Sequence, residues 1–168
     1  MAQHVIALPS ATPQSQHTAP RFTAWYVLGT DCGCSASVAD DLVKRRPRSD
    51  WIEIVWLVGP EPDLARRLME VGYEVRHIDP TELARQHRIQ GAPWLALFDQ
   101  NGQPVYSGGY SRQRPGVPGA FNLTDDIMAA VSSGKTFSTL PAYGCATSEA
   151  LRARLDPLHL KYPAPLSP

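Results

Sequence analysis

Apolar stretches of strand length alternate with amphipathic stretches of helix length along most of this chain. The runs 22–29 and 51–58 are mostly apolar and rich in aromatic and β-branched residues, which is typical of buried strands. Residues 35–46 instead carry apolar side chains at helical spacing and end in basic residues before Pro47. This alternation predicts an α/β fold with a mainly parallel sheet and helices on both of its faces.

The pattern continues to about residue 132. The remaining predicted elements are helices over 61–71, 81–87 and 121–132, and strands over 73–78, 94–99 and 103–108. Asn101 and Gly102 separate the last two strands and form a strong hairpin signal, so these two strands are expected to be antiparallel. The predicted sheet is therefore mixed.

The two ends of the chain differ in composition from this central part. Residues 1–20 are rich in Pro, Ser, Thr and Gln, a composition that cannot build a core and predicts a disordered linker or tail. Residues 163–168 are predicted to be a C-terminal tail, which leaves one folded domain over 21–162. No apolar run approaches the roughly 20 residues of a membrane helix, and the first 20 residues lack the apolar core of a signal peptide. Whether a signal or anchor precedes this sequence stays open.

Charge weighs against one class of partner. The chain has 16 Lys and Arg residues and 16 Asp and Glu residues, so its formal net charge is zero. A nucleic-acid partner usually requires a basic face, and we therefore expect none.

The chain has three cysteines, Cys32, Cys34 and Cys145, and this odd count does not suit a disulfide scaffold. The close pair lies between a predicted strand and a predicted helix, where free backbone N–H groups stabilise a thiolate and lower its pKa from about 8.5. Asp31 opposes this effect by charge repulsion. Redox exchange or metal capture is the expected use of the pair, and buried, inert thiols are the alternative.

A disulfide between Cys32 and Cys34 would close a small ring. Gly33 is the residue that best tolerates the unusual backbone angles of such a ring. The ring is expected to be strained, and a strained disulfide is easily reduced, so it would be a relatively strong oxidant.

The segment 88–102, with Gly91-Ala92-Pro93 before an apolar strand and a hairpin turn, resembles the cis-proline segment of the thioredoxin family. The resemblance implies a thioredoxin-like fold and a cis bond before Pro93. It also implies that the backbone of Ala92 binds an extended substrate strand. Trp94 is either a substrate platform or a core residue.

Two further segments resemble particular groups of thioredoxin-like proteins. The strand and helix over 51–71 resemble the insertion of TlpA and ResA type thiol–disulfide oxidoreductases, and residues 140–145 resemble the tail of the RedB group. The implied activity is thiol–disulfide exchange with a protein or small-thiol substrate and a redox partner protein. The implied location is extracytoplasmic, where disulfide exchange is common, although a cytoplasmic location stays open.

The sequence departs from the family pattern at three positions. Ser35 occupies the place of the second cysteine, Asp31 replaces an aromatic residue, and Tyr26 replaces a buried acid. We therefore treat Asp31, Gly33 and Tyr26 as residues that tune the site.

The sequence assigns a role to each thiol and leaves two alternatives. Cys32 is the expected nucleophile and Cys34 the resolving thiol, and no organic cofactor is expected. Residues 133–145 are long enough to bring Cys145 back to the site as a third redox thiol or ligand, or it is a lone structural cysteine. The first alternative function is a thiolate site for Cu(I) or another soft metal, with Cys32, Cys34 and Cys145 as ligands. The second is a redox-inactive adaptor.

Overall fold

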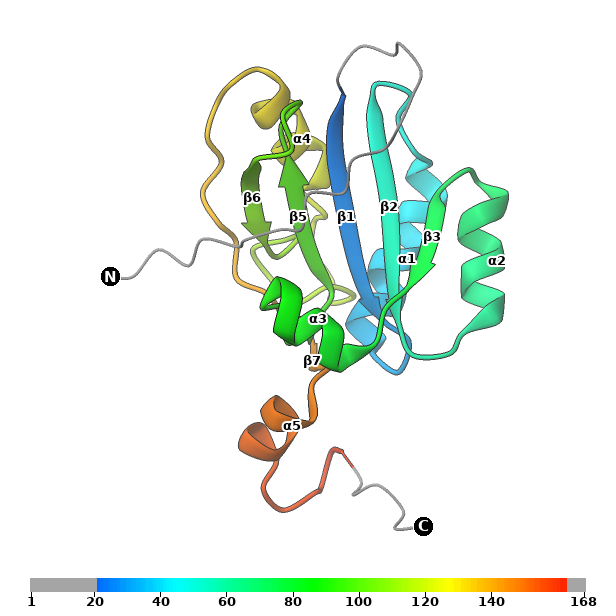
Figure 1. Ribbon diagram of the computed structural model, residues 1–168, viewed down its shortest axis with the longest axis vertical. Helices are drawn as coiled ribbons and strands as arrows, with labels where there is room; N and C mark the ends of the chain where they lie inside the picture. The colour runs from blue at the N-terminus through cyan, green and yellow to red at the C-terminus, as the bar shows by residue number, and fades with distance from the viewer. Residues whose placement is uncertain (1–20, 163–168) are drawn as a thin grey trace.

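A computed structural model describes residues 21–162, and the predicted tails at 1–20 and 163–168 lie outside the described residues (Figure 1). The elements, in chain order, are β1 (Phe22–Gly29), α1 (Gly33–Arg45), β2 (Trp51–Val58), α2 (Pro62–Glu70), β3 (Glu74–His77), α3 (Pro80–His87), β4 (Gly91–Ala92), β5 (Trp94–Phe98), β6 (Pro104–Gly108), α4 (Thr124–Ser132), β7 (Cys145–Ala146) and α5 (Glu149–Leu155).

Five of the strands form one sheet in the order β3-β2-β1-β5-β6. The central strand β1 pairs in parallel with β2 from Phe22 opposite Trp51 to Gly29 opposite Val58. On its other side β1 pairs antiparallel with β5, and β5 continues antiparallel into β6. The sheet is therefore mixed, as the sequence predicts, with β2 as an interior strand and β3 as an edge.

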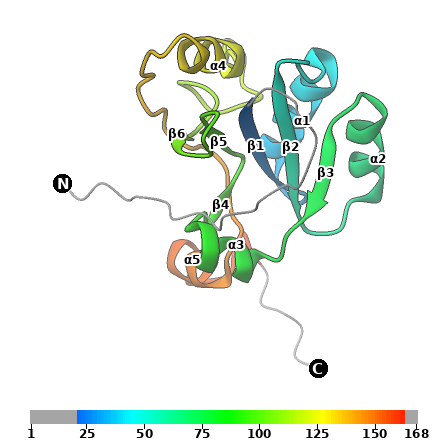
Figure 2. The ribbon, with the colours of Figure 1, turned by 45° about the horizontal axis from the view of Figure 1, so that its top comes forward.

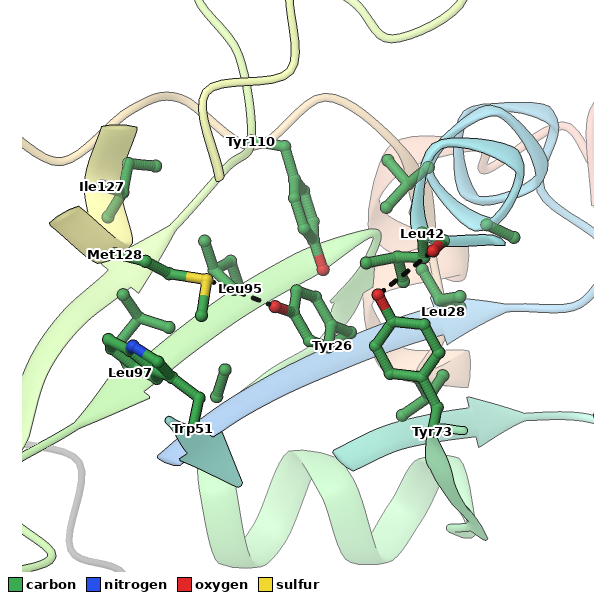
Figure 3. Packing of buried hydrophobic residues seen from close by; sticks show 14 of the residues in the cluster. Tyr26, Leu28, Leu42, Trp51, Tyr73, Leu95, Leu97, Tyr110, Ile127 and Met128 are labelled. Carbon is green, nitrogen blue, oxygen red and sulfur yellow. Dashed lines mark hydrogen bonds between the residues drawn. The ribbon is translucent and has the colours of Figure 1, made fainter. Parts of the chain in front are cut away.

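The side chains of β1 point alternately to the two faces of the sheet and lie in two separate apolar clusters. Ala24, Tyr26 and Leu28 lie in the larger cluster, together with buried side chains of α1, α2 and α4 (Figure 3). Val27 lies in a smaller cluster on the opposite face, against Leu83 of α3. Successive strand residues point to opposite faces, and both faces of the sheet are covered by helices.

The smallest elements are the ones that the sequence does not predict. The two-residue strands β4 and β7 pair with each other in a separate antiparallel ladder, which joins residues more than fifty positions apart (Figure 2). Helix α1 also begins at Gly33, two residues before its predicted start at Ser35. The architecture is thioredoxin-like: a mixed sheet between helices, with a helix after the central strand and a hairpin after the proline segment.

No helix over residues 21–162 combines the length and the apolar character that crossing a membrane requires.

Candidate functional site

Cys32 lies in the turn between β1 and α1. It is the N-cap residue of α1, with an extended backbone (φ −117°, ψ 116°), and its side chain is buried, at 3% exposure. No side chain caps this helix start, and the first N–H groups of α1 have no partner within the helix. A negative charge on the Cys32 sulfur is therefore stabilised where the helix begins.

The surroundings of Cys32 favour its thiolate. Burial acts to raise the pKa of Cys32, but hydrogen bonds from the Cys145 thiol and from the backbone and side chain of Ser35 oppose it. The backbone N–H of Cys34 adds to them, and the net effect is a lowered pKa. A lowered pKa increases the thiolate fraction near neutral pH, and the thiolate is the nucleophilic form of cysteine.

Ala92 and Pro93 face Cys32 from the segment before β5. The peptide bond between them is cis, which is the geometry that the Gly-x-Pro segment predicts. The Cys32 thiol donates a hydrogen bond of 3.5 Å to the carbonyl oxygen of Ala92. Ala92 and Pro93 also line an open groove of about 400 Å³, and we call it the cis-proline groove. Its lining includes Gly91, Ala92, Pro93, Trp94, Gly144 and Cys145.

Cys145 reaches the same place from the C-terminal part of the chain. In β7 it lies directly opposite Ala92 of β4, and Ala146 lies opposite Gly91. Burial and the hydrogen bond to Cys32 raise the pKa of the Cys145 thiol to about 11, and the charge of Cys32 adds to the shift. The structure therefore brings Cys145 to Cys32, in agreement with the length argument from the sequence.

Cys34 faces another part of the site. It is buried in the first turn of α1, where its sulfur accepts a hydrogen bond of 3.4 Å from Nε of Arg114. Arg114 belongs to the loop between β6 and α4. Ser35, in the place of the usual second cysteine, is buried and accepts a hydrogen bond of 3.0 Å from the N–H of Gly29. Ser35 thus binds the end of β1 to the start of α1.

Two residues beside Cys32 differ from expectation. Asp31 forms an ion pair with Arg152 of α5, with 3.2 Å between Oδ2 and Nη2, so a cation offsets the charge that was expected to oppose the thiolate. Gly33 is the first helical residue of α1, and a Cβ there would meet no atom within 4 Å. With both thiols free, the backbone at this position does not require glycine.

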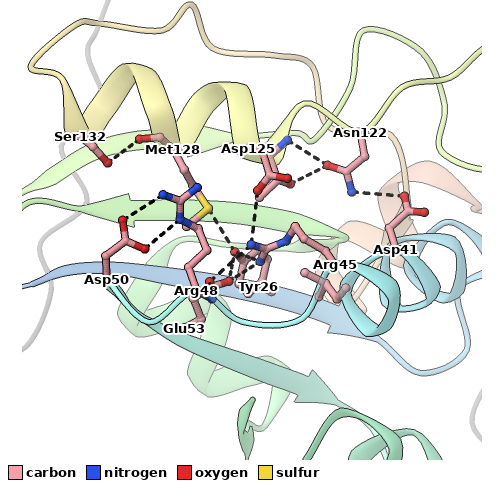
Figure 4. Close-up of polar contacts among 12 residues, drawn as sticks. Tyr26, Asp41, Arg45, Arg48, Asp50, Glu53, Asn122, Asp125, Met128 and Ser132 are labelled. Carbon is pink, nitrogen blue, oxygen red and sulfur yellow. Dashed lines mark hydrogen bonds and ion pairs between the residues drawn. The ribbon is translucent and has the colours of Figure 1, made fainter. Parts of the chain in front are cut away.

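Tyr26, expected to tune the site, instead belongs to a buried polar cluster around Arg45 (Figure 4). Its hydroxyl donates a hydrogen bond of 2.6 Å to Glu53 of β2, and Arg45 binds both groups. Glu53 lies opposite Ala24 in the ladder, so the hydroxyl points toward the start of β1 and away from the cysteines at its end. The sequence does not show this pairing, because the acid comes from a neighbouring strand.

Trp94 lies between the core and the groove. It is half-buried, packs against the smaller apolar cluster and lines the cis-proline groove. Its indole N–H donates a hydrogen bond of 2.9 Å to Oγ of Ser107, and its carbonyl accepts one of 2.7 Å from the hydroxyl of Tyr110. These contacts fix the ring at the edge of the groove.

Three residues of the site were not singled out as site residues from the sequence. Arg114 contacts Cys34, Arg152 contacts Asp31, and Gly144 lies against Ala92. Nothing in the sequence pattern pointed to Arg152.

Comparison with known proteins shows similarity at the level of the fold. No model of a protein family matches this sequence, and no curated protein sequence matches it. A solved structure of a hypothetical protein from Sinorhizobium meliloti 1021 aligns with a TM-score of 0.61 at 20% identity, over 77% of this chain and 80% of the other. An uncharacterized conserved protein from Geobacillus kaustophilus aligns at 0.53 and 16% identity, over 77% of each chain.

A third structure is the thioredoxin domain of a thiol-disulfide oxidoreductase from Bacteroides vulgatus. It aligns at a TM-score of 0.47 and 14% identity, over 69% of this chain and 80% of the other. Strand order, the helix that begins at the cysteine turn and the hairpin after Pro93 make this chain thioredoxin-like in fold.

Proposed function

We propose that this protein is a thiol–disulfide oxidoreductase in which Cys32 is the nucleophile. The observation that carries the proposal is the position of the Cys32 thiol, which has a lowered pKa and lies at the start of α1 against the carbonyl of Ala92. A thiolate at that position can attack a disulfide that is held along the backbone of the cis-proline groove.

The proposed exchange has two steps. The Cys32 thiolate attacks one sulfur of the substrate disulfide, a mixed disulfide forms, and the other substrate sulfur leaves as a thiolate that takes up a proton. A second thiol of the protein, either Cys34 or Cys145, then attacks the Cys32 sulfur and releases the remaining substrate thiol. The substrate is reduced by two electrons and the protein is oxidised by two, so no organic cofactor is needed.

The substrate side of the proposal rests on Ala92, Pro93 and Trp94. All three line the cis-proline groove, which would hold an extended protein or small-thiol disulfide, and the carbonyl of Ala92 contacts the Cys32 thiol. A redox partner protein would return the thiols to their starting state. The resemblance to the TlpA and ResA type, and to the RedB group, supports an extracytoplasmic location for this exchange.

The experiment that tests the proposal is the equilibration of reduced protein with glutathione disulfide, followed by acid quenching, alkylation and mass measurement. The wild type should lose its free Cys32 thiol and form a disulfide. Cys32→Ser should slow exchange at least a hundredfold, because neither remaining thiol occupies the N-cap position of α1. Ser37→Ala, on the exposed side of the same helix, is the matched control and should exchange like the wild type. Equal exchange by Cys32→Ser and the wild type would refute the role of Cys32.

The soft-metal alternative makes a different prediction in the same samples. Over residues 21–162 no three side chains among His, Cys, Asp and Glu are grouped so that they could hold a metal ion. Metal analysis of the protein after incubation with Cu(I) would detect such a site. A protein that retains Cu(I) through its cysteines but does not exchange disulfides would favour the alternative, and failure of both tests would favour a redox-inactive adaptor.

A further inference from the structure

The backbone edge that the proposed function assigns to a substrate strand is already occupied by the chain itself. Cys145 lies opposite Ala92, Ala146 lies opposite Gly91, and the N–H of Thr147 donates a hydrogen bond of 2.8 Å to the carbonyl of Gln90. Figure 2 shows β4 beside the orange segment that leads into α5. This is strand addition to an exposed edge, the mode in which many extended peptides bind, performed here by a segment of the same chain.

The fit of this segment is close at Gly144. A Cβ at that position would lie 1.9 Å from the carbonyl oxygen of Ala92 and 2.8 Å from Cδ of Pro93. Any side chain larger than that of glycine would therefore push the segment away from Ala92 and Pro93. The absence of a Cβ is what lets Cys145 approach the residue that Cys32 contacts.

Contacts on both sides hold the segment in place. The N–H of Gly109 donates a hydrogen bond of 3.0 Å to Leu140, which is buried. After the strand, Nε of Arg152 donates one of 2.9 Å to the carbonyl of Ala146, and the Tyr162 hydroxyl accepts one of 2.9 Å from the N–H of Ala146. The segment is thus fastened before and after Cys145.

The two candidate partners of Cys32 are placed differently. Cys32 and Cys145 both lie at Ala92, one by a hydrogen bond to its carbonyl and the other by strand pairing. Cys34 is the second residue of α1, and side chains two positions apart at a helix start do not face each other. Its sulfur is turned to Arg114 instead. A bond between Cys32 and Cys34 would require the first turn of α1 to change conformation.

We propose that the redox-active disulfide of this protein joins Cys32 to Cys145, and that its formation fastens residues 142–147 against the backbone edge of Gly91 and Ala92. The inference rests on the proposed function, because it takes Cys32 as the nucleophile. Oxidation covers the backbone edge at Ala92, and reduction frees the segment to make way for an extended substrate strand. Cys34 then stays a free thiol beside Arg114 and takes no part in the disulfide.

The step needs an external disulfide as oxidant, and glutathione disulfide is sufficient. The Cys32 thiolate attacks it, forms a mixed disulfide and releases one glutathione thiolate. Cys145 then loses its proton and attacks the Cys32 sulfur, so that the Cys32–Cys145 bond forms and the second glutathione leaves with that proton. Two protein thiols are oxidised and one disulfide is reduced to two thiols. Once Cys32 is in the mixed disulfide, its negative charge no longer opposes ionisation of Cys145.

Disulfide mapping after equilibration with glutathione tests which thiols pair. We expect a peptide pair that joins Cys32 to Cys145, with Cys34 alkylated as a free thiol. Cys34→Ser should form the same bond, whereas Cys145→Ser should stop at a glutathione adduct on Cys32. A Cys32–Cys34 bond with Cys145 free would overturn this inference and leave the proposed function intact. Oxidation of no thiol in any variant would overturn both.

Gly144→Ala tests whether the fit of the segment matters. We expect the equilibrium constant for forming the Cys32–Cys145 bond to fall at least tenfold, because the added Cβ displaces the segment from Ala92. Gly134→Ala is the control: with φ +72° it also strains the backbone, but far from the cysteines in sequence, so it should lower stability without changing this equilibrium constant. Thermal unfolding of both variants checks that each is folded. An unchanged equilibrium constant in folded Gly144→Ala would overturn the inference.

Hydrogen exchange tests whether oxidation fastens the segment to the backbone edge at Ala92. The amide of Thr147, bonded to Gln90, should exchange at least tenfold more slowly in the oxidised than in the reduced protein. In Cys145→Ser the same redox treatment should not slow this exchange. Equal exchange rates in oxidised and reduced wild type would show that the disulfide does not fasten the segment.

Discussion

Arg152 of α5 and Asp31 of the cysteine turn form an ion pair across 121 positions of the chain, with 3.2 Å between Nη2 and Oδ2. Asp31 directly precedes Cys32, so the pair joins the last helix to the cysteine turn. Arg152 thereby offsets the charge of Asp31, which by itself would disfavour the Cys32 thiolate.

The ion pair between Asp31 and Arg152 predicts that the pKa of Cys32 depends on Arg152 and on salt concentration. Arg152→Gln should raise the pKa of Cys32, by less than about one unit because the pair is partly exposed to solvent. Ultraviolet absorbance of the thiolate as a function of pH measures the change. In an Asp31→Asn background, Arg152→Gln should change the pKa of Cys32 little further. In 1 M salt the pKa of Cys32 should be the same in Arg152→Gln and the wild type. A full shift in the Asp31→Asn background would mean that Arg152 acts through its bond to Ala146 instead.

The raised pKa of Cys145 predicts how its reactivity depends on Cys32. Burial and the hydrogen bond and charge of Cys32 raise this pKa to about 11, so the thiolate fraction of Cys145 at pH 8 is very small. Cys32→Ala removes the hydrogen bond and the charge and leaves the burial. The alkylation rate of Cys145 at pH 8 should therefore rise, by about tenfold for each unit that its pKa falls.

Timed alkylation followed by peptide mass measurement gives this rate at each pH. Cys34→Ala is the matched control, because it leaves Cys32 in place and should change the rate little. A pH profile of Cys145 that is identical in Cys32→Ala and the wild type would show that the two thiols are independent.

The buried cluster around Arg45 predicts a large loss of stability. Arg45 binds the fully buried carboxylate of Glu53, and the hydroxyls of Tyr26 and Tyr73 also accept hydrogen bonds from it. Arg45→Met should lower the free energy of unfolding by about 3–5 kcal/mol, because it leaves the Glu53 charge buried without its partner. Arg48→Met, which removes an exposed pair with Asp50, should cost at most about 1 kcal/mol. Urea unfolding measures both, and equal losses would contradict the assigned role of the cluster.

Because His87 is buried, we expect the protein to lose stability in mild acid. Burial lowers the pKa of His87 below its usual 6.5, against a smaller opposing effect of Glu82. Below pH about 6.5 the unfolded chain therefore binds a proton that the folded protein does not, and stability falls as pH decreases toward the folded pKa. In His87→Leu the change in unfolding free energy between pH 7.5 and 5 should be smaller than in the wild type.

The exposed His77 of β3 provides the control for this measurement. His77→Leu should keep the pH dependence of the wild type. If His87→Leu and the wild type lose the same free energy between the two pH values, other groups cause the acid sensitivity.

The sequence predicts the long elements well and the short contacts of the site poorly. Strands β1 and β2 begin and end at the predicted residues, because each is an apolar run with clear boundaries. Strands β4 and β7 have two residues each and exist only because distant segments pair, so no local pattern reveals them. Chain length showed that Cys145 could return to the site, but not that it would lie opposite Ala92.

Tyr26 illustrates the same distinction. The sequence lacks the buried acid in β1, which is why Tyr26 is expected to tune the cysteines. Glu53, on the neighbouring strand, supplies a buried acid instead, with Arg45 as its partner. Which charges meet in a core depends on strand register and helix packing, neither of which the residue pattern fixes.

Because Cys145 belongs to the same chain as Cys32, an external thiol or disulfide competes with an intramolecular reaction. A tethered group acts at an effective concentration of about millimolar or more, even on a flexible linker. Here the tether is held at Ala92 by strand pairing, so little further ordering is needed for the two sulfurs to meet. A partner present at micromolar concentration must then contribute binding energy of its own to displace β7. Selectivity in this protein would therefore reside in how well a partner replaces residues 142–147, more than in the reactivity of its sulfur.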